Sequence, residues 1–160
     1  MFWAAFGFGL RTELIALEGD PASERGGVTG RVIRDLYAEQ LPRIIRPGDT
    51  FMHDNAPVHG SHLVTELLEN LDITVMIWPP YSPDLNPEEN VWPVLKNKTY
   101  DVEPRLVLLP NNNSVVRDVL VPAAKEAWRQ IPMEMTDKLA LEMGKRVDAV
   151  IQAEGWYTKY

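Results

Sequence analysis

The sequence contains no cysteine in its 160 residues. This absence excludes a disulfide-stapled scaffold, a zinc–thiolate centre and a cysteine nucleophile, and it leaves the redox compartment open. Long hydrophobic runs are also absent, since a membrane helix needs roughly 20 apolar residues. The apolar opening Met1–Phe8 lacks the basic region that precedes the apolar core of a signal sequence. We therefore expect no membrane segment and no export signal.

Basic charge is in deficit, because 16 lysines and arginines stand against 23 aspartates and glutamates, for a formal net charge of −7. A simple electrostatic binder of nucleic acid carries a basic excess that displaces counterions from the phosphates, so the composition excludes that class. Hydrophobic residues make up 45% and charged residues 24%, the balance of an ordinary globular protein. The length fits a single domain over residues 1–160.

Hydrophobic patterning and turn residues predict alternating strands and helices. Apolar segments over 1–8 and 11–18, joined near Gly9, predict an antiparallel hairpin. A helix is predicted from about Thr29 to Leu41, with an apolar face, and a short buried strand over 50–54.

The middle of the chain predicts a strand–helix–strand unit. Ser61 is a suitable N-cap for a helix that ends near Leu71, and the β-branched segment 72–78 predicts the next strand. Helices at about 114–130 and 134–153 close the chain, and the second carries a predicted core-facing stripe of Met135, Leu139, Met143, Val147 and Ile151. Together these elements predict an α/β layered fold.

Four tryptophans are assigned to packing. Trp92 is expected to anchor its own helix in the core, and the other three are Trp3, Trp78 and Trp128. No further role is predicted for them.

Polar residues follow the predicted strand 50–54, where a fold would not need them. The segment is His53-Asp54-Asn55-Ala56-Pro57-Val58-His59, and Asp54 lies at the carboxyl end of the strand, where open α/β sheets bind ligands. Asn55 could bond a metal-bound water or close a turn, and both alternatives stay open. His59 and His62 flank the next helix, where a capping or solvent role is commoner than ligation of a magnesium ion.

A second polar segment, Ser82-Pro83-Asp84-Leu85-Asn86-Pro87-Glu88-Glu89-Asn90-Val91-Trp92, precedes a predicted helix that continues to about Lys98. Asn86 can cap this helix, and Glu89 falls at its third position, where it could complete a capping box. The helix dipole keeps such a carboxylate ionised, as a metal ligand must be, so the two interpretations are compatible. Asp84 is expected to fix the loop. Lys96 and Lys98 could reach a phosphate backbone or remain solvated.

The spacing of Asp54 and Glu89 makes the pair more informative than either residue. The 34 residues between them hold one predicted helix and one predicted strand, a βαβ crossover that could bring both carboxylates to one sheet edge. Hard divalent ions take oxygen ligands. Two carboxylate-held ions can activate a water or a 3′-hydroxyl and stabilise the leaving oxygen of a phosphodiester.

At these residues the chain resembles the catalytic domain of mariner-type DDE transposases, relatives of integrases with a ribonuclease H-like fold. The resemblance is carried by Asp54–His59, by Trp78–Trp92, by the 34-residue interval and by the ending Gly155–Tyr160. The opening Trp3–Gly19 resembles the second and third strands of that family. The resemblance covers nearly the whole chain and implies an α/β fold with a mixed sheet flanked by helices.

The resemblance also implies an acidic triad that holds two magnesium or manganese ions for DNA strand cleavage and transfer. Asp54 matches the second acid and Glu89 the third, so both are predicted as catalytic residues and metal ligands. Predicted DNA-contacting or site-supporting residues are Asn55, His59, Lys96 and Lys98. DNA is the implied partner and the nucleus the implied location.

The first acid of the family lies upstream of the segment that resembles Trp3–Gly19, and Glu13, Glu18 and Asp20 are in the wrong place to replace it. We therefore expect a domain truncated at its N-terminus, without the central first strand. Such a core would hold one ion or none, be inactive or weak alone, and associate with itself or a partner chain to complete the sheet. The alternatives are a non-catalytic remnant that binds nucleic acid or protein, a clipped gene model, and an unrelated interaction domain.

Overall fold

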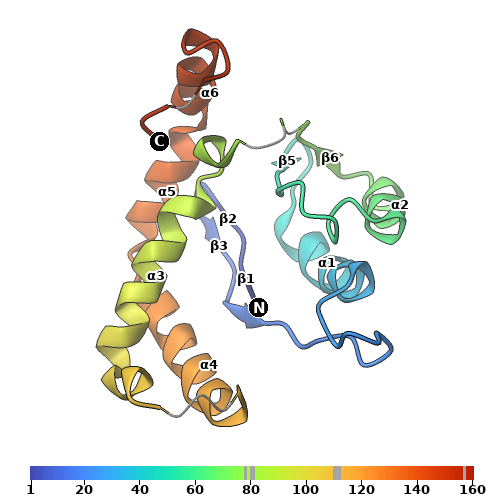
Figure 1. The fold of residues 1–160 in the computed structure, drawn as a ribbon. Helices are drawn as coiled ribbons and strands as arrows, with labels where there is room; N and C mark the ends of the chain where they lie inside the picture. Colours follow the sequence, from blue (N-terminus) through green and yellow to red (C-terminus); the bar gives the residue numbers. More distant parts are fainter. Residues whose placement is uncertain (78, 80–81, 110–112, 157) are drawn as a thin grey trace. The chain divides into compact units, whose positions relative to one another are not determined.

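The computed structural model describes residues 1–77, 79, 82–109, 113–156 and 158–160 (Figure 1). The chain forms two compact units, each with its own packing. The first unit comprises Met1 and residues 17–82, and the second comprises residues 2–16 and 83–160.

The first unit contains a strand–helix–strand crossover. Its elements are α1 (Gly30–Ile44), β5 (Thr50–Phe51), α2 (His62–Asn70) and β6 (Thr74–Val75). β5 and β6 pair in parallel, with Thr50 opposite Thr74 and Phe51 opposite Val75. The predicted crossover is confirmed, although both strands are shorter than predicted.

Helices α1 and α2 pack against each other through buried apolar residues. α1 buries Ile33, Leu36, Tyr37 and Leu41. α2 buries Val64 and Leu68, whereas Leu63 and Leu71, which also lie in its apolar segment, are exposed.

The second unit begins with the predicted antiparallel hairpin, which is divided by a bulge. Its strands are β1 (Phe2–Trp3), β2 (Phe6–Gly7), β3 (Leu10–Arg11) and β4 (Ile15–Ala16), with β1 paired to β4 and β2 to β3. Between the two ladders, Thr12–Leu14 on one side faces only Ala4–Ala5 on the other, so one strand carries an extra residue. The amide of Ala5 donates to Oγ1 of Thr12 at 2.9 Å, which satisfies the backbone at this bulge.

Helices make up the rest of the second unit. They are η1 (Pro83–Leu85), α3 (Glu88–Val102), η2 (Pro104–Val107), α4 (Asn113–Gln130), α5 (Met133–Leu141) and α6 (Met143–Gln152). Pro122 lies inside α4, which continues through it as one helix.

The prediction of one helix over 134–153 is wrong, because α5 ends at Leu141 and α6 begins at Met143. The residues of its predicted core-facing stripe are therefore not all buried. Leu139 is buried, whereas Val147 is 40% and Ile151 68% exposed. Gly144, a weak helix former, lies just after the break, and Arg146 is the buried residue of α6.

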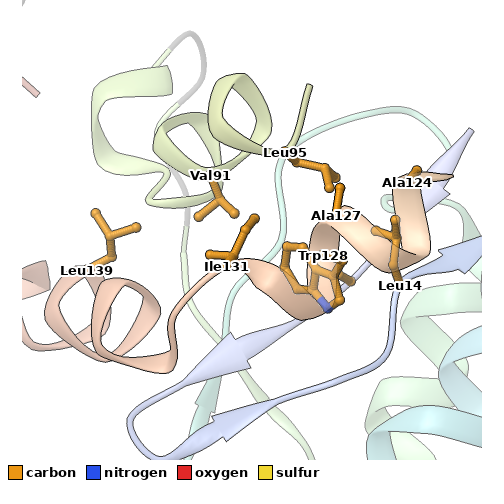
Figure 2. Close-up of a cluster of buried hydrophobic side chains, with 9 residues drawn as sticks. Leu14, Val91, Leu95, Ala124, Ala127, Trp128, Ile131 and Leu139 are labelled. Atoms are coloured by element: carbon orange, nitrogen blue, oxygen red, sulfur yellow. The ribbon is translucent and has the colours of Figure 1, made fainter. Parts of the chain in front are cut away.

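The core of the second unit joins the hairpin to α3, α4 and α5 (Figure 2). Its buried members are Ala4, Leu14, Val91, Leu95, Ala124, Ala127, Trp128, Ile131 and Leu139. Trp92 packs against this cluster and its ring lies 6.5 Å from that of Trp128. The predicted packing roles of Trp3, Trp92 and Trp128 agree with these positions, while Trp78 lies outside the described residues.

The result is a mixed helix and sheet fold, as predicted. Over the described ranges, the strands form three two-stranded sheets, and β5 pairs there only with β6. No helix in these ranges is long and apolar enough to cross a membrane.

Candidate active site

Asp54 lies in the loop between β5 and α2, and its carboxylate is held from two sides. Its Oδ1 accepts a hydrogen bond from the amide of Ala56 at 3.0 Å and from Nδ1 of His59 at 2.7 Å. The side chain is 51% exposed. Within the described residues Oδ2 accepts no hydrogen bond, so the carboxylate is oriented by one oxygen and presents the other.

His59, which donates to Asp54, belongs to a cluster of four rings. The cluster is formed by Tyr37, Phe51, His53 and His59. The imidazole rings of His53 and His59 stack at 5.2 Å, Tyr37 stacks on His59 at 6.0 Å, and Phe51 meets Tyr37 edge-on at 5.3 Å. Burial, and to a smaller extent the nearby charge of His59, lower the pKa of His53 to about 4, although Asp54 opposes both effects. His53 is therefore neutral at physiological pH and serves as packing for His59.

Sequence reasoning missed His53 and Tyr37 as parts of this site. His53 could have been found from its position as a polar residue at the end of a buried strand. Tyr37 gave no such signal, because it belongs to the apolar face of a helix. Asn55 is exposed in the loop. His62 is 90% exposed, with Nδ1 lying 3.6 Å from Oε2 of Glu66, in agreement with the solvent role predicted for it.

The start of α3 carries the second predicted carboxylate, Glu89. The side chain of Asn86 caps the helix, since its Oδ1 accepts from the amide of Glu88 at 3.1 Å. A full capping box would also use the amide of Asn86, but that group donates to the carbonyl of Pro83 at 2.9 Å. Glu89 is exposed in the first helical turn and is not needed for the cap.

Glu88, the neighbour of Glu89, has the opposite environment. Its Oε2 is buried and has no hydrogen-bond partner within the described part of the chain. Burial, and to a smaller extent the charge of Glu89, raise the pKa of Glu88 to about 8. Glu88 is therefore mostly protonated at pH 7, while its neighbour faces solvent.

The Glu88→Gln substitution is expected to remove a pH dependence of stability. The folded-state pKa of about 8 lies above the ordinary 4.5, so the folded protein holds this proton more tightly than the unfolded chain. The stability is fully present below about pH 4.5 and falls by about 2–4 kcal/mol as the pH rises through 8. Urea unfolding at pH 5, 6.5 and 8 should show this decline in the wild type and a flatter profile in the variant.

The matched control is Glu134→Gln, which removes an exposed carboxylate from α5. It should keep the wild-type decline. Equal pH profiles for the wild type and Glu88→Gln would show that Glu88 is not protonated in the folded state.

The loop before α3 is fixed by the end of the chain. Oδ2 of Asp84 accepts from the amide and from the hydroxyl of Thr158, at 3.3 and 3.0 Å. Arg146 donates through Nη1 to the carbonyl of Asp84 at 2.8 Å and through Nη2 to Oδ1 of Asn90 at 2.6 Å. The expected role of Asp84 in fixing the loop agrees with these contacts, and the ending Thr158–Tyr160 gains a structural role that the sequence alone did not suggest.

The remaining predicted residues lie where α3 places them. Lys96 is exposed and Lys98 half-buried. Lys96 follows Glu89 by seven residues, two helical turns, and so shares its face of α3. No group of three or more acidic, histidine or cysteine side chains that could hold a metal ion occurs within the described ranges.

Asp20 is committed to a structural role. It is 3% exposed and accepts from the hydroxyl of Thr29 at 2.7 Å and the amide of Ala22 at 2.9 Å. These hydrogen bonds, that of Thr29 first, lower the pKa of Asp20. Its carboxylate anchors the loop that leads into α1.

Comparison with known proteins identifies the family of this chain. The model of the family described as DDE superfamily endonuclease matches residues 23–104. The Transposable element Tc1 transposase of Caenorhabditis elegans is 35% identical over 113 residues, 71% of this chain and 38% of the relative. The Transposable element Tcb1 transposase of Caenorhabditis briggsae is 31% identical over 141 residues, 83% of this chain and 48% of the relative. The chain thus spans less than half the length of these relatives.

Among solved structures, the Mos1 transposase catalytic domain with Raltegravir and Mn is similar to 99% of this chain, which covers 82% of that domain. The TM-score is 0.62 and the sequence identity 18%. This likeness shows the fold, and with it the predicted ribonuclease H-like class is confirmed.

Proposed function

The chain belongs to the DDE superfamily endonuclease family, and we propose from this that it forms part of the catalytic core of a DNA transposase. Its reaction would be cleavage and transfer of DNA strands by metal-dependent phosphodiester chemistry. The observation that carries the proposal is the pair of exposed carboxylates, Asp54 held by His59 and Glu89 in the first turn of α3.

The chemistry of these two groups fits a divalent ion. Magnesium and manganese take oxygen ligands, and each site offers carboxylate oxygen next to solvent. Asp54 keeps Oδ2 for a ligand while His59 and Ala56 occupy Oδ1. Glu89 lies in the first turn of α3, where the helix dipole favours a negative charge. A bound ion would activate the attacking oxygen and stabilise the leaving one.

The surrounding residues would orient these ligands and bind the substrate. His59 fixes the direction of the Asp54 carboxylate, and the stacked ring of His53 fixes His59. Asn55 lies next to Asp54 in the exposed loop, where its amide could bond a water or the nucleic acid. Lys96, on the Glu89 face of α3, and Lys98 are suited to neutralise the DNA backbone.

Titration with manganese tests the proposal directly. In NMR spectra, Mn²⁺ should broaden the amide resonances around Asp54 and those around Glu89 at low ratios of metal to protein. Asp54→Asn should weaken the broadening around position 54, and Glu89→Gln should weaken that around position 89, because each substitution removes an anionic ligand.

Glu66→Gln is the control, since it removes an exposed carboxylate of α2 that belongs to neither segment. Broadening that is absent, or equal at Glu66 and the two proposed ligands, would contradict the metal site. The chain would then act as a non-catalytic, transposase-derived binding module.

A further inference from the structure

The second unit contains a buried arginine that the proposed chemistry does not use. Arg146 of α6 is 1% exposed, although arginine is rarely fully buried without strong partners. Both of its terminal nitrogens donate to the segment that carries Glu89. We infer that Arg146 is a positioning residue that fixes the start of α3 and so the direction of the Glu89 carboxylate.

The two acceptors of Arg146 lie on either side of the proposed ligand in the chain. The carbonyl of Asp84 precedes Glu89 by five residues, and the side chain of Asn90 follows it immediately. A guanidinium is planar, and its donors diverge at fixed angles. The arginine therefore fixes the distance between η1 and the first turn of α3, which a single-point ammonium could not do.

The tail of the chain closes this arrangement. Thr158 donates twice to Oδ2 of Asp84, so Asp84 is held through its side chain by the tail and through its carbonyl by Arg146. The ring of Tyr160 lies 4.9 Å from the guanidinium carbon of Arg146, in cation–π geometry. Arg146 and the chain end Thr158–Tyr160 (the tail) thus form a clamp on Asp84 and Asn90. The clamp residues lie far along the chain from the residues that they hold.

A clamp that only stabilised the fold would act on the whole second unit. A positioning clamp acts first on the amides of Glu89 and Asn90, which donate to the carbonyls of Asn86 and Pro87 at the start of α3. It also acts on the proposed metal ligand Glu89, because the geometry of this helical turn sets the direction of the Glu89 carboxylate. This inference rests on the proposed function only in its second part, the effect on metal binding.

The test measures hydrogen exchange and manganese binding in the intact chain. Arg146→Lys keeps the charge but cannot hold both acceptors, and Asn90→Ala removes one acceptor while leaving Arg146 in place. Each variant should speed exchange at Glu89 and Asn90 about tenfold, equivalent to about 1.4 kcal/mol, with little change in the α4 core. Each should also weaken Mn²⁺ broadening at Glu89 by a similar factor.

Lys145→Gln is the matched control, because Lys145 neighbours Arg146 on α6 and is 70% exposed. It should match the wild type in both measurements. Unchanged exchange at Glu89 and Asn90 in both test variants would overturn the clamp. Faster exchange with unchanged manganese binding would make it structural only and overturn the positioning role. Absence of manganese binding in the wild type would instead refute the proposed function, and the exchange data would still decide the clamp.

Discussion

Replacing Glu89 by glutamine is expected to lower DNA nicking by at least about 10³-fold. A metal ion contributes several kcal/mol of transition-state stabilisation, and each 1.36 kcal/mol corresponds to a factor of ten in rate. Loss of one anionic ligand therefore removes most of the catalysis. Asp54→Asn should have an effect of the same size, since it removes the second proposed ligand.

Both substitutions should leave the fold nearly unchanged, which separates chemistry from stability. Oδ1 of an asparagine at position 54 can still accept from Ala56 and His59, as the aspartate does. A glutamine at position 89 remains exposed on α3 and loses only its favourable interaction with the helix dipole, about 0.3–1 kcal/mol. Melting temperatures of the variants should therefore stay close to that of the wild type.

A suitable assay replaces the matching region of the Tcb1 transposase with this chain, because the chain spans 48% of that relative. The chimera then carries everything that the rest of a transposase contributes. Nicking of a supercoiled plasmid with the transposon ends, in the presence of Mn²⁺, gives the rate.

Glu88→Gln is the decisive comparison, because it removes the neighbouring carboxylate that is buried and mostly protonated at pH 7. It should nick at a rate within a few-fold of the wild-type chimera. If Glu88→Gln abolished nicking and Glu89→Gln did not, the ligand assignment along α3 would be wrong.

The candidate site was predictable to the extent that its signals are local in sequence. Asp54 and Glu89 stood out because each follows or begins a regular element at a polar segment with turn and capping residues. The contact between Asp54 and His59 joins residues only five apart, so it lies within one motif. The clamp by Arg146 joins residues 62 and 56 positions apart, and a helical arginine is ordinarily a solvated one.

The fold, too, was predictable only where its signals are local in sequence. The hairpin and the crossover of β5, α2 and β6 follow from alternating apolar residues and turn signals, which act between near neighbours. The bulge opposite Ala4–Ala5 did not follow from this pattern, because it depends on the Thr12 hydroxyl replacing a strand partner. The break between α5 and α6 was missed because the i, i+4 spacing of apolar residues continues through it, while burial selects Arg146 for the inner face.

Truncating Trp128 to alanine is expected to destabilise the second unit by about 3–5 kcal/mol, the range for large aromatic residues in a core. Trp128 is 1% exposed, stacks on Trp92 and lies among the side chains that join α3, α4 and the hairpin (Figure 2). Its Nε1 donates to the carbonyl of Thr12 at 2.8 Å, at the bulge. Such a loss is a large part of the 5–15 kcal/mol that stabilises a typical domain.

Trp128→Phe tests the two contributions, because it keeps most of the aromatic volume and removes the donor to Thr12. It should cost about 1–3 kcal/mol, the penalty for leaving a buried carbonyl without its partner. Trp156→Ala is the control, since that side chain is 73% exposed and its loss should stay within about 0.5 kcal/mol. Urea unfolding followed by far-UV circular dichroism gives the three values. Equal costs for phenylalanine and alanine at position 128 would mean that the hydrogen bond at the bulge, rather than the filled volume, holds the hairpin to α4.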